Sequence, residues 1–116
     1  MATVITDSIS IAAGARNDDV LAAKRNAIIH VTARRGARIA LYTTGSAAGL
    51  FHEMYVGERN AMERSLVNAQ NRVPVVPDDF VVGNIAGLPN ERVRLSVDNP
   101  TGGAITLFYR LEIAEL

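Results

Sequence analysis

Two histidines and no cysteine leave this chain few side chains for nucleophilic or metal chemistry. A catalytic triad needs a nucleophile beside a histidine that a carboxylate orients. His52 precedes Glu53, but successive residues of a strand point to opposite faces, so this pair is not expected to meet. Because His30 and His52 also lack the spacing of zinc ligands, we interpret both as structural or surface residues. The sequence predicts no catalytic residue and no metal ligand.

The remaining candidates for ligand chemistry are two acidic doublets and one loop of small residues. Asp18-Asp19 and Asp78-Asp79 lack the D-x-D-x-D-G spacing of a calcium loop, so we interpret them as solvated turns. The loop at 45–49 has neither the Lys-Ser/Thr pair of a phosphate-binding loop nor a helix after it. No cofactor is predicted, and the chain is predicted not to be an enzyme.

Arginine dominates the positive charge, since Lys24 is the only lysine among the 12 basic residues. The planar guanidinium suits carboxylates and protein interfaces, although a GC-rich genome would give the same bias. Arg34, Arg35 and Arg38 form a group with no aromatic residue between them to stack nucleic-acid bases. The net charge is also zero, so we expect no nucleic-acid partner and interpret the three arginines as an interface group.

The elements that must position these residues are strands, because the apolar residues alternate with a period of two. The alternation is clearest over 92–98 and 105–113, and the residues 99–103 between them form a turn sequence. These three segments predict a hairpin. Upstream, 26–33 has apolar residues on both faces, as in a central strand, and is predicted to form a second hairpin with 38–44.

Further strands are predicted at 9–11, at 50–56 and from 80–82 to a turn at 87–90. On 50–56 the residues Leu50, His52, Met54 and Val56 should share one face, opposite Phe51, Glu53 and Tyr55. The segment 61–71 fits either a strand or a short helix, and we favour the strand because its neighbours are strands. The segment 74–77 carries two prolines, which predicts an extended piece at an edge or in a loop.

Turn signals every eight to fifteen residues, with seven or eight strands between them, predict one all-β domain over residues 1–116. We expect an antiparallel β-sandwich resembling a jelly roll. Val4 and Ile5 belong to an apolar stretch that is interpreted as the first strand, with an N-terminal arm over 1–12, pairing with a neighbouring molecule, as the alternative. The first residues lack the features of a secretory signal, and no stretch has the length of a membrane span, so no membrane contact is expected.

The order of these features resembles the capsid decoration or cement proteins of bacteriophages, which are small structural proteins of the virion. The residues that carry the resemblance are the opening segment 9–16, the segment 17–22 after it, the segment 74–79 and the turn at 97–103 before the last strand. The resemblance implies a homo-oligomer, often a trimer, that binds the major capsid protein and stabilises the shell. The protein would be made in the host cytoplasm and would reside in the virion.

Two other functions remain open at the level of sequence. The first is a different virion subunit with the same sandwich, such as a small coat, tail or spike protein. The second is a non-viral ligand-binding β-sandwich module, which a pocket holding a histidine against a carboxylate would favour.

Overall fold

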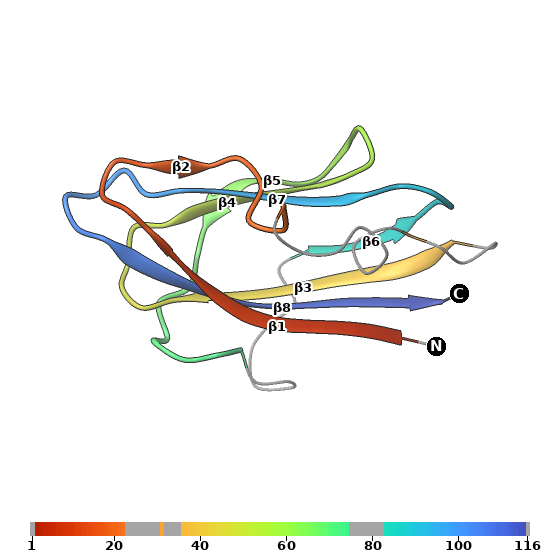
Figure 1. The fold of residues 1–116 in the computed structure, drawn as a ribbon, viewed down its shortest axis with the longest axis horizontal. Coiled ribbons are helices and arrows are strands. Elements are labelled where there is room, and N and C mark those ends of the chain that lie inside the picture. Colours follow the sequence, from red (N-terminus) through yellow and green to blue (C-terminus); the bar gives the residue numbers. More distant parts are fainter. Residues whose placement is uncertain (1, 23–30, 32–35, 75–82, 116) are drawn as a thin grey trace.

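The described residues of the chain form two antiparallel four-stranded sheets that pack face to face (Figure 1). The computed structural model describes residues 2–22, 31, 36–74 and 83–115. Its strands are β1 (Ala2–Ile11), β2 (Arg16–Asn17), β3 (Ala37–Gly45), β4 (Phe51–Val56), β5 (Arg59–Leu66), β6 (Gly83–Gly87), β7 (Val93–Asp98) and β8 (Ile105–Glu115). Sheet A has the order β1-β8-β3-β6, and sheet B has the order β2-β7-β4-β5. The predicted all-β sandwich is confirmed.

The core lies between the two sheets and follows the alternation seen in the sequence. Every second residue of β8 is buried, and the residues between them are partly exposed. The same alternation on β4 buries Met54 and Val56 and turns Phe51 and Tyr55 outward, so the predicted division of these side chains between two faces is confirmed. The radius of gyration is 13.5 Å, close to the roughly 13 Å expected of a compact domain of this length. Within the described ranges, no helix has the length and apolarity needed to cross a bilayer.

The predicted hairpin between 92–98 and 105–113 is wrong, although both strands are present. β7 pairs with β4 and β2 in sheet B, whereas β8 pairs with β1 and β3 in sheet A. The segment 99–104 therefore crosses from one sheet to the other instead of joining neighbouring strands. Apolar alternation shows that each strand has one buried face. It is the same whether two consecutive strands pair within one sheet or belong to opposite sheets that face each other across the core.

The crossover after β7 is held by the buried side chain of Asn99. Its Nδ2 donates to the carbonyl oxygens of Ile11 at 3.0 Å and Gly103 at 2.8 Å. Its Oδ1 accepts from the N–H of Thr101 at 3.1 Å and from the hydroxyl of Thr101 at 2.6 Å. The Asn99 N–H donates to the carbonyl of Ala15 at 2.8 Å. This one residue therefore joins the β7–β8 loop to both ends of the β1–β2 connection.

The tight hairpin of sheet B lies between β4 and β5. Val56 faces Arg59 across the pair, so Gly57 and Glu58 form a two-residue turn. The φ of Gly57 is +61°, and a positive φ at the first central position is the requirement of a type II′ turn, which glycine meets without strain. The strand interpretation of 61–71 is right as far as Leu66, and the helix alternative is wrong.

The second predicted hairpin lies partly outside the described residues, because only Val31 of the segment 26–33 is described. The N–H of Val31 donates to the Glu91 carbonyl, and its own carbonyl accepts from the N–H of Asn90, both at 2.8 Å. The described partners of β3 are β8 and β6. The segment 75–82, which includes Asp78, Asp79 and the predicted start of a strand at 80–82, also lies outside the described residues.

The first strand pairs along its whole length within the chain. β1 runs antiparallel to β8 with an unbroken register, from Ala2 opposite Ala114 to Ile11 opposite Ile105. The two ends of the described chain consequently lie side by side at one end of sheet A (Figure 1).

Candidate functional site

The residues proposed from the sequence as an interface do not form one cluster. Val4 is 48% exposed and belongs to the outer face of sheet A, whereas Ile5 is buried in the core. Arg38 is exposed on β3 and shares the outer face with Val4, because Arg38 lies opposite Ala114 and Val4 lies opposite Glu112 on the strand between them. Arg34 and Arg35 lie outside the described residues.

His52 lies inside the sandwich and bridges the two sheets. Its side chain is 2% exposed, and its Nδ1 lies 3.0 Å from the hydroxyl oxygen of Thr43 on β3. Burial lowers the pKa of His52 to about 4, because the charged imidazolium is poorly solvated there. Glu53 points to the opposite face, as predicted. This ring contacts the other sheet and is too enclosed to reach a substrate, which fits a structural role; His30 lies outside the described residues.

The first acidic doublet belongs to a structured turn. Asp19 Oδ1 accepts from the N–H of Leu21 at 3.0 Å, and its carboxylate pairs with Arg92 at 2.6 Å. Asp18 pairs with Arg16 at 2.8 Å. A search of the described residues finds no group of three or more histidine or acidic side chains that could hold a metal ion.

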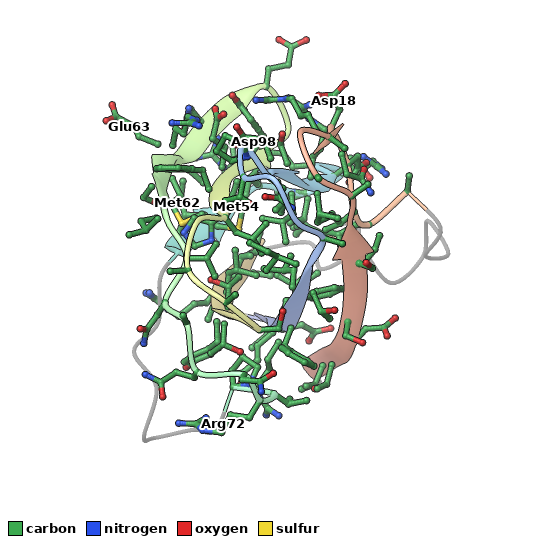
Figure 2. The ribbon with its side chains drawn as sticks, turned by 90° about the vertical axis from the view of Figure 1, so that its left-hand side faces the viewer. Asp18, Met54, Met62, Glu63, Arg72 and Asp98 are labelled. Carbon is green, nitrogen blue, oxygen red and sulfur yellow. The ribbon has the colours of Figure 1, made fainter. Side chains whose placement is uncertain are left out.

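Arginines, aromatic rings and carboxylates from four strands meet on the outer face of sheet B, and we call this set the arginine–aromatic network. Its members are Arg16, Asp18, Phe51, Glu53, Tyr55, Arg64, Arg94 and Asp98. Figure 2 shows Asp18 and Asp98 on the sheet B side of the sandwich, with Arg72 on the opposite side. Met54 points from the same sheet into the interior (Figure 2).

One half of the network is centred on Tyr55. The guanidinium of Arg94 lies over the tyrosine ring, 4.3 Å from its centroid, and Nη1 of Arg94 donates to the carbonyl of Asp18 at 3.3 Å. The Tyr55 hydroxyl donates to Glu53 Oε2 at 2.8 Å, which raises the pKa of Tyr55. The other oxygen of Glu53 lies 3.4 Å from Nη2 of Arg16. The hydrogen bond to Asp18 and the attraction of Glu53 raise the pKa of Arg16.

The other half is centred on Phe51. Arg64 of β5 covers this ring with its guanidinium 3.9 Å from the centroid, and its Nη2 pairs with Asp98 Oδ2 at 2.9 Å. The register explains the cluster, because Phe51 lies opposite Asp98 on one side and opposite Leu66 on the other. Leu66 is 60% exposed beside it.

Ser96 lies between the two halves, directly opposite Glu53 on β7. Its side chain is 2% exposed, and its Oγ is the one buried side-chain polar atom in the described part of the chain without a hydrogen-bond partner. A buried hydroxyl without a hydrogen-bond partner costs free energy. The side chains that cover Ser96 therefore lower the stability of the fold at this point.

The network is electrically balanced and held in place. Its three arginines are matched by the three carboxylates of Asp18, Glu53 and Asp98. Stacking and ion pairing already restrict the motion of the guanidiniums. These side chains therefore lose less conformational entropy when a partner docks than unrestrained arginines would lose. Arginine and tyrosine are also the residue types enriched at protein interfaces and their hot spots. A balanced face of this kind suits a protein partner and has no excess charge for a polyanion.

The arginines of this network were not predicted as site residues from the sequence. The outward positions of Phe51, Glu53, Tyr55 and Arg94 follow from alternation alone, but their meeting depends on the pairing of β4 with β7. Arg16 and Arg64 belong to a two-residue strand and to the segment with two interpretations, so neither had a face assignment.

The chain matches no protein-family model and no curated protein.

Proposed function

We propose that this chain is a non-enzymatic structural protein of a virion, of the capsid decoration or cement class, and that the outer face of sheet B docks on the shell. The observation that carries the proposal is the arginine–aromatic network, in which Arg64 and Arg94 are stacked on aromatic rings of an exposed sheet face. A decoration protein binds by surface complementarity and needs no cleft. A broad face with preorganised arginines and an exposed Leu66 provides the contacts that such binding uses.

The role in the particle is tested by mass spectrometry of purified virions from the source of this sequence. A decoration protein is present in a fixed ratio to the major shell subunit and can be removed without dissolving the shell. If the chain is itself the most abundant protein, it is a coat subunit. If it is absent from the particles, the virion proposal fails and a cellular binding module becomes the better explanation.

The docking face is tested by titrating shells that lack the chain with the purified protein. R64A/R94A removes both stacked guanidiniums from the outer face of sheet B, where Arg64 is exposed and Arg94 is half-buried, and should leave the fold intact. Loss of a hot spot worth about 2 kcal/mol weakens binding about thirtyfold. R110A is the matched control, because Arg110 also pairs with a neighbouring carboxylate, Glu112 at 2.6 Å, but lies on the outer face of sheet A. Equal affinities of both variants would refute this face as the docking surface.

A further inference from the structure

Within the described part of the chain, β1 has one unpaired edge, and this edge differs from the other edges of the two sheets. Sheet A ends at β1 and β6, and sheet B ends at β2 and β5. β2 has two residues, and β6 has five. β5 is longer, but its pairing with β4 is interrupted by register shifts, and it carries Arg59, Glu63 and Arg64. Short length, irregular pairing and charge are the features by which proteins prevent edge-to-edge association.

β1 has fewer of these protective features, and the one it has is Asp7, whose carboxylate accepts from the N–H of Ser8. Its ten residues pair with β8 without a bulge, which makes a continuous edge of about 33 Å. It has no proline and no basic residue, and Asp7 is its only charge. β8 is its only paired strand among the described residues. Such an edge is a template for another strand.

The groups that face this edge follow from the hydrogen bonds of β8. Thr106 of β8 accepts from the N–H of Ser46, which continues the β3 ladder, so even-numbered residues of β8 bond toward β3. The odd-numbered residues of β8 then bond toward β1, where they meet the odd-numbered residues from Thr3 to Ile11. The N–H and C=O groups that point away from β8 therefore belong to Ala2, Val4, Thr6, Ser8 and Ser10. One of them already has a partner within the strand, because the N–H of Ser8 donates to the side chain of Asp7 at 2.8 Å.

We infer that the β1 edge pairs antiparallel with β1 of a second copy of this chain, joining two A sheets into one continuous eight-stranded sheet. A second copy fits because each edge offers the donors and acceptors that the other lacks, and a two-fold axis places the same residues on both sides. The inference goes beyond the proposed function and holds whatever the larger partner is. It gives a dimer, whereas the resemblance to decoration proteins implies a homo-oligomer that is often a trimer.

The single charge of β1 selects the register. The core-facing sides of the two A sheets lie on the same side of the joined sheet only when even-numbered residues face even-numbered residues and odd-numbered face odd-numbered. Pairing centred on Asp7 would place two carboxylates opposite each other, which is destabilising. Pairing centred on Thr6 uses residues 2–10 of both strands and places Asp7 opposite Ile5 of the second copy. In this register Val4, which is 48% exposed in the single chain, lies opposite Ser8 of the second copy.

The edge is tested by the mass of the purified chain in solution. Sedimentation equilibrium should give twice 12.4 kDa at high micromolar concentration. Thr6→Pro removes an N–H that faces the free edge and is not used by β8, so the variant should fold and become monomeric. Thr6→Ala keeps the N–H and should remain a dimer. Far-ultraviolet circular dichroism of each variant checks that the sheets are intact.

A second pair of variants tests the register without proline. V4K/S8K places two lysines opposite each other at both ends of the interface and should weaken the dimer at least about tenfold. V4K/S8E places opposite charges at the same positions and should restore it. A monomeric wild-type chain, or an oligomer that survives both T6P and V4K/S8K, would overturn the inference. If the V4K/S8E variant does not dimerise more strongly than V4K/S8K, the register centred on Thr6 is wrong.

Discussion

Acidification should destabilise this protein through His52, whose ring is buried between the two sheets. An unfolded histidine has a pKa of 6.5, and burial lowers the value in the fold to about 4. Between pH 6.5 and about pH 4, His52 is protonated in the unfolded state but not in the folded state. The free energy of unfolding therefore decreases as the pH falls through this window. The difference of about 2.5 units, at 1.36 kcal/mol each, corresponds to about 3 kcal/mol.

The assay is urea unfolding followed by circular dichroism at a series of pH values, for the wild type and for His52→Gln. Glutamine does not titrate and can still accept from the Thr43 hydroxyl, so the variant retains an inter-sheet contact. Ion-paired carboxylates also destabilise the fold in acid, since Arg59 lowers the pKa of Glu91 and that contribution is lost as this carboxylate is protonated.

The quantity to compare is therefore the difference in unfolding free energy between wild type and variant at each pH, in which the carboxylate contributions cancel. This difference should fall by about 3 kcal/mol between pH 7 and pH 4. A difference that does not change with pH would show that His52 is solvated and that the burial argument is wrong.

Two further predictions concern the core and the crossover. Leu95→Ala and Leu107→Ala should each cost about 2–5 kcal/mol in chemical unfolding, because both side chains are fully buried and leave a cavity; wild-type stability in both variants would contradict the assigned faces. Asn99→Ala should cost at least about 1–3 kcal/mol, because the carbonyl of Ile11 and the N–H of Thr101 lose their buried partner. Hydrogen exchange at Thr101 should accelerate in this variant, and unchanged protection would mean that the loop is held by other contacts.

Alternation was sufficient to assign faces on most strands of the described chain. It placed His52 and Glu53 on opposite faces of β4, and it placed Leu95 and Leu107 in the core. Alternation is a local property of extended backbone and does not depend on which strand lies alongside. The segment 61–71 was ambiguous because a bulged edge strand interrupts the period of two, and the register shifts of β5 account for this.

Turn chemistry located the ends of strands but could not say which strands they join. The residues 99–103 stop β7 and begin the path to β8, yet the same turn residues serve a hairpin or a crossover between sheets. In the folded chain, Asn99 stabilises the crossover through hydrogen bonds to Ile11 and Ala15, which are distant in sequence.

The sequence by itself determined that the chain forms strands, where most of them stop and which side chains enter the core, because side-chain alternation and turn residues act over a few positions. Only the tertiary structure decided which strands are neighbours. Every strand offers the same backbone N–H and C=O groups, so these groups do not specify which strand pairs with which. The stacking of Arg64 on Phe51 and of Arg94 on Tyr55 follows from those neighbours, and so does the position of β1 at the edge of its sheet among the described strands.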